Sequence, residues 1–404
     1  MILTNCAACA APLAHTAPRC VRCHTRYCDS KCQHDHWRRG HKQMCKKIHR
    51  GGNAEQYYAD KKYKEAVAEA VEACADDTKG QKCYICLEAV HPRTGEGLVS
   101  GFCACRGGSS FAHISCLKRK AQLAMDEALE NNLDGDRMES RWRKWYSCEL
   151  CGQEYHGVVY SAMGWACWGS YLSLPETKRL GKLSPRQDAM KELANSLLSA
   201  NRVEEALAIF RTLVGICTRL GHERDDVPGL LYSIASCLMR LGRREEALQL
   251  DRDVYNLRVK WRVGPAKILQ SATSLTMSLV QNEKFSEARD FAREQIPVAT
   301  RSLGPHAELT RNLRTYYAKA ILCDTALPLD DVAESVAIFE DIEIITRRIF
   351  GNVHPDTLQA QKDMDSARMV WRARFSKPFP SKLPRLKTDD AKHEELMRKF
   401  ELAK

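Results

Sequence analysis

The stretch CVRCHTRYCDSKCQHDHWRRGHKQMC, residues 20–45, contains five cysteines and four histidines. A tetrahedral zinc ion takes four ligands, so nine candidates do not divide evenly among sites. With Cys6 and Cys9 added, the ligands form four pairs: Cys6-x2-Cys9, Cys20-x2-Cys23, Cys28-x3-Cys32 and His41-x3-Cys45. An x2 spacing is typical of a tight turn whose side chains face one ion. An x3 spacing places two ligands on one helix face, so both x3 pairs are predicted to be helical.

Three other histidines in this stretch have no partner at these spacings: His24, His34 and His36. His41 differs from them because it lies four residues before Cys45 and completes a pair. We interpret the three as solvent-facing polar residues, with His36 as the alternative ligand.

The whole pattern resembles the MYND zinc finger, over residues 6–45 and with all eight ligand positions matched. The resemblance implies interleaved sites, with Cys6, Cys9, Cys28 and Cys32 on one zinc ion and Cys20, Cys23, His41 and Cys45 on the other. A segment of ~40 residues buries too little apolar surface to fold alone, so the ions would link its distant parts. Such closed sites are structural, because no coordination position stays open for a substrate. The family also implies binding of proline-containing peptides.

A second ligand cluster follows a spacer rich in alanine, glutamate and lysine. The spacer, residues 51–79, is predicted to be a helix with Asn53 as its cap, with Tyr57, Val67, Val71 and Cys74 on one face. The ligand order after it is Cys83-x2-Cys86, Cys103-x1-Cys105, His113-x2-Cys116 and Cys148-x2-Cys151. These eight ligands are again enough for two closed sites.

This second cluster, with its flanks CRGGSSFAHISCL and CELC, resembles the RING-CH (C4HC3) zinc finger over residues 83 to about 156. The resemblance implies a cross-brace, with Cys83, Cys86, His113 and Cys116 on one zinc ion and Cys103, Cys105, Cys148 and Cys151 on the other. RING domains act as ubiquitin ligases by holding a ubiquitin-charged conjugating enzyme in a reactive pose. The contact residues would be Ile85 and Leu150.

The sequence departs from this family at two positions. Lys120 stands where the family often has tryptophan, and Gly152 stands where active members often have arginine or lysine. Trp142 or Trp145 could supply the aromatic from another direction. The alternative is that both tryptophans pack against the zinc core.

An internal repeat replaces the cysteine clusters from about residue 186. The segments NRVEEALAIF, GRREEALQLD and NEKFSEARDF place Ala206, Ala247 and Ala288 in register at a constant spacing, and DVAESVAIFE places Ser335 there. A glycine-marked loop recurs as well, at Gly221, Gly264, Gly304 and Gly351. Each repeat is therefore predicted to be a helical hairpin. Such a hairpin buries its apolar face only when it is stacked on neighbouring hairpins. Residues 186–373 resemble tetratricopeptide repeats of the kinesin-light-chain type, whose grooves bind peptides or partner proteins.

The sequence thus predicts a mainly α chain: two small cross-brace zinc modules followed by an all-α helical solenoid of tetratricopeptide type. The expected parts are 1–50 (MYND type), 51–79 (helical spacer), 80–157 (RING-CH type), 158–185 (apolar connecting helix), 186–373 (repeats) and 374–404 (basic tail). We expect the connecting helix to pack the second zinc module onto the first repeat. The tail should be a flexible proline-rich linker with a short helix at 388–402.

Charge and cysteine content indicate the cellular compartment, the cofactor and the class of partner. No signal peptide or membrane-length apolar stretch is recognised, and paired CxxC spacings favour metal over disulfides. We therefore expect a reducing compartment, cytoplasmic or nuclear, with Zn²⁺ as the cofactor. The formal charge is +11. Fourteen thiolates and four zinc ions would lower it to about +5, which argues against a dedicated nucleic-acid patch.

These patterns support three hypotheses for the function. The first is a RING-type ubiquitin ligase that recruits a conjugating enzyme through the RING-CH module and its substrate through the repeats, the MYND module or both. The second is a non-catalytic interaction scaffold held together by the same zinc ions. The third, nucleic-acid binding through the basic zinc region, predicts affinity that falls steeply with salt. No catalytic triad, paired catalytic carboxylates or phosphate loop stands out, so the enzyme class stays open at this point.

Overall fold

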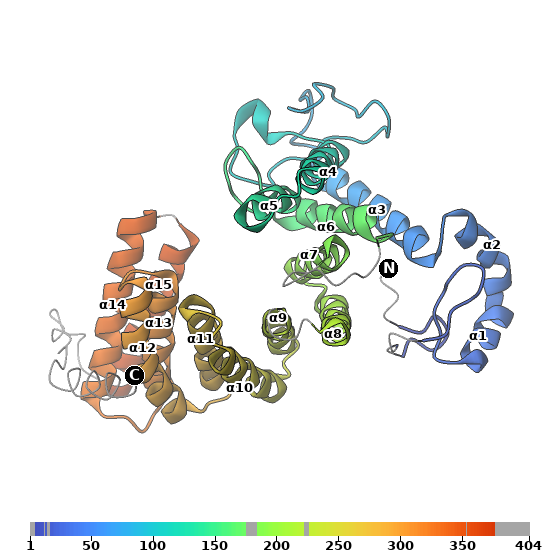
Figure 1. Ribbon diagram of the computed structural model, residues 1–404. Helices are drawn as coiled ribbons and strands as arrows, with labels where there is room; N and C mark the ends of the chain where they lie inside the picture. Colours follow the sequence, from blue (N-terminus) through green and yellow to red (C-terminus); the bar gives the residue numbers. More distant parts are fainter. Residues whose placement is uncertain are drawn as a thin grey trace. The chain divides into compact units, whose positions relative to one another are not determined.

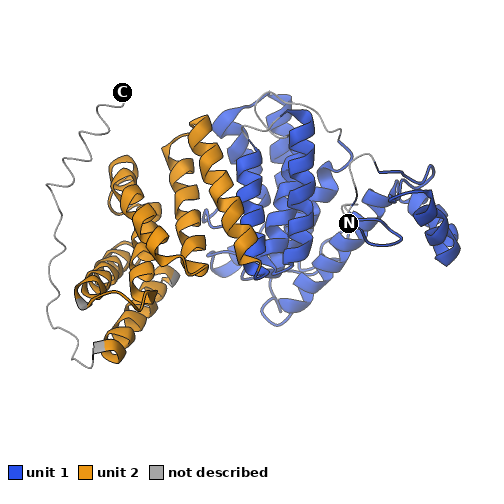
Figure 2. Ribbon diagram, turned by 90° about the horizontal axis from the view of Figure 1, so that it is seen from below, with its two compact units in different colours: residues 1–242 blue, residues 243–404 orange. Residues whose placement is uncertain are grey.

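The computed structural model describes residues 5–11, 13, 17–174, 184–221, 226–352 and 354–375. The chain divides into two compact units, residues 1–242 and 243–404, which Figure 2 draws in blue and orange. Within the described residues the regular structure is helical, and extended pairing is limited to three isolated bridges. The expected mainly α class is therefore confirmed. The proline-rich tail and its expected helix at 388–402 lie outside the described residues.

Two tight turns and a broken helix form the first cysteine-rich segment, the blue end of the chain in Figure 1. Helix α1 (Ser30–His36) begins after Asp29, whose side chain accepts a hydrogen bond from the backbone N–H of Cys32 at 2.8 Å. Because Asp29 is the cap, Cys28 lies just before the helix. The prediction of a fully helical Cys28–Cys32 pair was thus wrong for its first member.

A π-helical turn, η1 (Trp37–His41), joins α1 to α2 (Lys42–Arg50). Inside this turn Gly40 has a φ of 121°, a conformation that residues with a Cβ rarely adopt. The result is a kink at Gly40 between α1 and α2. It brings His41 into the buried interior of the segment.

The core of this segment consists largely of the candidate ligands themselves. Four buried cysteines pack together with three other buried residues, Tyr27, Ile48 and Ala54. Ala54 is the first residue of α3 (Ala54–Ala73), where Asn53 caps the helix as expected, by accepting from the N–H of Gln56 at 3.0 Å. So few apolar side chains cannot hold this segment together by burial alone.

Helix α3 is the spacer helix, and its most buried positions are alanines: Ala54, Ala59, Ala66 and Ala70. The expected packing residues Tyr57, Val67 and Val71 are only half-buried. Small side chains allow close helix approach, and α3 packs against α6 (Gly157–Tyr171). The buried face of this helix is therefore formed mainly by its alanines and not by the predicted apolar stripe.

The second cysteine-rich segment combines loops with helices η2 (Gly107–Ser110), α4 (Ile114–Glu130), α5 (Gly135–Trp142) and η3 (Arg143–Trp145). The long gap between Cys116 and Cys148 contains most of α4, all of α5 and η3. Trp142 and Trp145 are buried against Tyr171 of α6, with ring centroids 5.6 and 5.7 Å apart. These tryptophans therefore supply no exposed aromatic.

Helix α6 is apolar on all sides because it is surrounded by α3, α4 and α7 (Pro185–Ser199). A further contact involves Arg186 of α7. Its guanidinium pairs with Glu55 of α3 at 3.0 Å and lies 5.0 Å from the ring centroid of Trp168 in α6. This connects the spacer, the connecting helix and the first array helix. Among the described helices, none is long and apolar enough to cross a membrane.

Successive antiparallel helices make up the rest of each unit. Unit 1 continues with α8 (Val203–Leu220) and α9 (Val227–Arg240), and each helix packs on the one before it. Unit 2 contains α10 (Arg244–Trp261), α11 (Pro265–Gln281), α12 (Phe285–Leu303), α13 (Glu308–Cys323), α14 (Leu329–Phe350) and α15 (Pro355–Phe375), again in serial contact. These are the stacked hairpins that the repeat predicts.

The register of the repeat is visible in burial. Ala206, Ala247, Ala288 and Ser335 are each fully buried in their own unit. A small residue at this position lets neighbouring helices approach closely. Gly221, Gly304 and Gly351 end α8, α12 and α14, all with positive φ, whereas Gly264 begins α11 instead. At that point Arg262 takes the left-handed conformation that ends α10.

Candidate metal centres and the adjoining surface

The sixteen candidate ligands come together as four groups. The ligand atoms within each group lie within 4.8 Å of one another. The groups are Cys6, Cys9, Cys28 and Cys32; Cys20, Cys23, His41 and Cys45; Cys83, Cys86, His113 and Cys116; and Cys103, Cys105, Cys148 and Cys151. In both segments the pairs interleave, so each group joins parts of the chain that are far apart in sequence. Each group could hold a metal ion.

The separations within the groups match a tetrahedral zinc site. Zinc–sulfur bonds of about 2.3 Å place two sulfurs about 3.8 Å apart at the corners of a tetrahedron. The Sγ atoms of Cys20 and Cys45 are 3.8 Å apart, and those of Cys105 and Cys148 are 3.7 Å apart. A disulfide would need about 2.05 Å. The donor sets, either four cysteines or three cysteines with one histidine, are also those that zinc prefers.

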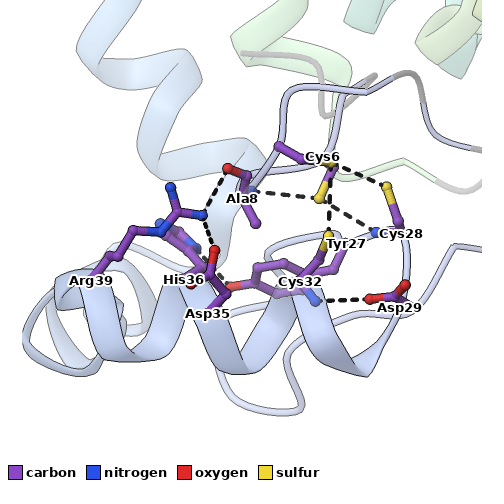
Figure 3. A network of polar contacts seen from close by, with 10 residues as sticks. Cys6, Ala8, Tyr27, Cys28, Asp29, Cys32, Asp35, His36 and Arg39 are labelled. Carbon is purple, nitrogen blue, oxygen red and sulfur yellow. Dashed lines mark hydrogen bonds and ion pairs between the residues drawn. The ribbon is translucent and has the colours of Figure 1, made fainter.

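In the first group, backbone N–H groups point at the sulfur of Cys6 (Figure 3). The amides of Ala8 and Cys28 both lie 3.4 Å from that sulfur. Burial raises the pKa of the Cys6 thiol, but hydrogen bonds from nearby backbone amides outweigh it and lower this pKa to about 6. The turn thus stabilises the thiolate, which is the form that binds metal.

The second group is the most buried of the four. His41 presents Nε2 to the sulfur of Cys23, 3.3 Å away. Burial, together with contacts to the neighbouring thiols Cys20 and Cys23, raises the pKa of Cys45 to about 12. Several thiolates cannot share so small a buried volume without a cation, so the donor set fits a dication.

The structure assigns roles to the three remaining histidines. His24 and His34 are exposed, as expected. His36 is neither solvent-facing nor a ligand: it stacks on His41 with ring centroids 4.7 Å apart. Its Nδ1 lies 3.0 Å from the hydroxyl of Tyr27, a contact visible in Figure 3. His36 and Tyr27 therefore hold the ring of His41 in place. The sequence analysis considered His36 only as a solvent-facing residue or an alternative ligand and did not identify this role.

In the third group His113 presents its other nitrogen, Nδ1. This atom lies 3.3 Å from the sulfur of Cys86 and 3.7 Å from that of Cys116. Its Nε2 faces the carbonyl oxygen of Ala89 at 3.5 Å, which orients the ring and selects the tautomer that can bind a metal. Glu96, also missed from sequence, accepts hydrogen bonds from the backbone and hydroxyl of Ser115 and so anchors the start of α4.

In the fourth group the last turn is closed by a hydrogen bond from the N–H of Gly152 to the carbonyl of Cys148, 2.8 Å long. Gly152 has a φ of 73°. An arginine or lysine here would adopt a left-handed conformation at a cost of about 1–2 kcal/mol. The turn geometry therefore accounts for glycine at the position where the RING-CH resemblance leads one to expect a basic residue.

The expected partner-contact residues are both exposed. Ile85 lies in the turn between Cys83 and Cys86 and is 36% exposed; Leu150 lies in the turn between Cys148 and Cys151 and is 54% exposed. Exposed aliphatic side chains at the tips of two rigid turns suit an apolar contact with another protein.

Between these two turns lies Lys120 of α4. Its ammonium forms an ion pair with Glu149, and it lies 5.2 Å from the ring centroid of Tyr84. Lys144 also pairs with Glu149, at 3.0 Å. Burial raises the pKa of Glu149, but the contacts with Lys120 and Lys144 outweigh it and hold this pKa below its ordinary value. Sequence reasoning identified Lys120 as a departure from the family pattern but did not identify its partners.

Comparison with known proteins adds little to this site. No family model matches the chain. Ubiquitin carboxyl-terminal hydrolase 17 of Arabidopsis thaliana is 54% identical to it over 43 residues, which are 10% of this chain and 6% of that protein.

Three solved structures are similar to the chain. A single-residue variant of TPR-like repeats from Podosopora anserina, described as kinesin light chain, has a TM-score of 0.40 and 19% identity over 47% of this chain and 89% of its own. A second structure of these repeats has a TM-score of 0.32 and 14% sequence identity, and the match covers 66% of this chain and 99% of that one. BtubC of P. vanneervenii has a TM-score of 0.32 and 14% sequence identity, and the match covers 68% of this chain and 95% of that one. All three TM-scores are below 0.5. The fold is therefore described from the serial packing of helices within each unit of the chain itself.

Proposed function

We propose that the four ligand groups bind four zinc ions, two in a MYND-type module (residues 1–50) and two in a RING-CH-type module (residues 80–157). Support comes from the donor sets and from sulfur separations of 3.7–3.8 Å in two of the groups. With four protein ligands each, the ions would be closed to substrate and would act as structural links. Their contribution is to hold segments with few apolar core residues in a fixed shape.

We propose further that the chain is a ubiquitin ligase of the RING type. The observation that carries this proposal is the pair of exposed side chains, Ile85 and Leu150, on two turns that Lys120 connects. These side chains would contact a ubiquitin-charged conjugating enzyme and hold its thioester in a reactive pose, which is catalysis by positioning. The helical repeats, the MYND-type module or both would bind the substrate.

The test is discharge of ubiquitin from charged conjugating enzymes to free lysine, with the full chain expressed in zinc-containing medium. Ile85→Ala should abolish the acceleration while zinc content and thermal stability stay unchanged. Ile344→Ala is the matched control, since Ile344 is 40% exposed on α14 and belongs to unit 2. Full activity of Ile85→Ala would remove Ile85 from the contact surface and refute the proposed mode of recruitment.

A second candidate is an interaction scaffold without ligase activity. It is favoured by Gly152 at the end of the last turn. The positive φ at this position disfavours the arginine or lysine that active members of the family often have there. The scaffold would hold the same zinc ions, so metal content does not separate the two functions. A failure to accelerate discharge across a broad panel of conjugating enzymes, by protein carrying four zinc ions, would favour the scaffold.

A further inference from the structure

Lys120 is placed differently from the other basic side chains of its helix. It reaches two separate turns: its ammonium lies over the ring of Tyr84 and pairs with Glu149. Tyr84 directly precedes Ile85, and Glu149 directly precedes Leu150. One side chain on α4 therefore contacts the chain neighbours of both exposed aliphatic residues.

This contact is more than a loose surface pair. The side chains of Lys120 and Glu149 are 27% and 34% exposed, so the pair is partly shielded from solvent. Glu149 is held from a second side by Lys144, which restricts the carboxylate to one position. Tyr84 is fixed by its backbone, whose N–H donates to the carbonyl of Phe111 at 3.0 Å. Each end of the Lys120 contact is thus itself held in place.

We propose that Lys120 is a positioning residue of the proposed ligase: by linking Tyr84 to Glu149, it fixes the spacing between Ile85 and Leu150. The inference rests on the proposed function. In this chain an ion pair and a cation–π contact would do what an aromatic side chain does by packing at the same helix position. Lys120 acts through its neighbours and need not touch the partner itself.

The decisive experiment is a double-mutant cycle in the ubiquitin-discharge assay. Lys120→Met and Glu149→Gln are made singly and together in the full chain, because both remove charge at nearly constant volume. We expect each single variant to slow discharge about fivefold and the double variant to be no slower than Lys120→Met, since both substitutions break the Lys120–Glu149 pair. Lys120→Arg should restore most of the rate, because it retains a cation that can pair with Glu149.

Two further measurements separate positioning from folding. Zinc content and thermal stability should be the same in all variants, whereas the affinity for the conjugating enzyme should follow the discharge rate. Lys79→Met is the control, because Lys79 forms a solvent-exposed ion pair with Asp76, at 78% and 94% side-chain exposure. It should discharge at the wild-type rate.

Several outcomes would overturn the inference. If Lys120→Met is fully active, Lys120 positions nothing. If the two single effects multiply in the double variant, the residues act independently, and Lys120 does not act through Glu149. If wild type itself fails to discharge ubiquitin, the proposed function and this inference fall together. Loss of activity in Ile85→Ala with full activity in Lys120→Met would refute the inference alone.

Discussion

A buried carboxyl group in α7 makes the stability of unit 1 depend on pH. Glu192 is 5% exposed, and its Oε1 has no hydrogen-bond partner in the part of the chain that is described. Burial raises its pKa from 4.5 to about 7, while a hydrogen bond with the phenol of Tyr160 and the charge of Lys191 oppose the rise. Glu154 and Glu139 add negative charge nearby. We therefore predict that Glu192→Gln stabilises the protein above neutral pH.

The sign and size follow from proton linkage. In the unfolded chain Glu192 loses its proton near pH 4.5, whereas in the folded chain it keeps the proton to about pH 7. Between these values the folded state binds more protons, so its stability falls as pH rises. The full difference corresponds to about 3 kcal/mol, reached above pH 7. Asp188, one turn away on α7, has its pKa raised by burial to about 7 as well and adds to the same trend.

The assay is thermal unfolding of the full zinc-loaded chain between pH 5.5 and pH 8. Wild type should lose stability over this range, and Glu192→Gln should lose less, since only the contribution of Asp188 remains. At pH 8 the variant should melt about 4 °C higher, and at pH 5.5 this difference should fall to less than half, because wild type then retains most of its proton at Glu192. Glu204→Gln, at an exposed position on α8, is the control and should follow wild type. Parallel pH profiles for wild type and Glu192→Gln would show that Glu192 is not buried as a neutral acid.

Two other predictions concern the metal groups. Removing zinc with a chelator should expose residues 17–156 to protease while helices α7 to α15 stay protected, because the first region depends on its ligands for a core. Mass spectrometry of the fragments checks this, and equal protection of both regions would contradict it. Gly40→Ala should cost about 1–2 kcal/mol, since the φ of 121° at Gly40 disfavours any Cβ. It should weaken zinc binding at the His41 group alone, measured by competition with a chromophoric chelator. Gly108→Ala, at a site without positive φ or crowding, should bind zinc normally; equal loss in both variants would refute the role given to Gly40.

Much of the local structure could be predicted from sequence because its causes are local. Ligand spacing alone indicates tight turns and helical pairs, and a cap residue such as Asn53 identifies the first residue of its helix. The recurrence of small residues at Ala206, Ala247 and Ala288 indicates stacked hairpins, since only a small side chain fits where two helices cross closely. Each of these three alanines is fully buried. Local signals failed where one cap, Asp29, outweighed the ligand spacing and started α1 after Cys28.

The division of sixteen ligands into four groups could not be derived from spacing, because equal spacings allow several partitions. The expected sets came from the family resemblance. The tertiary structure brings the same sets together. Other features depend on contacts between segments far apart in the chain. Lys120 meets Glu149 and Tyr84 only after the two turns fold against α4. Glu192 is buried only because α6 covers α7. By itself, therefore, the sequence determined which residues can bind metal and where hairpins form. Tertiary packing decided which charges pair and which carboxyl groups lose their water, because those energies depend on neighbours that no local pattern encodes.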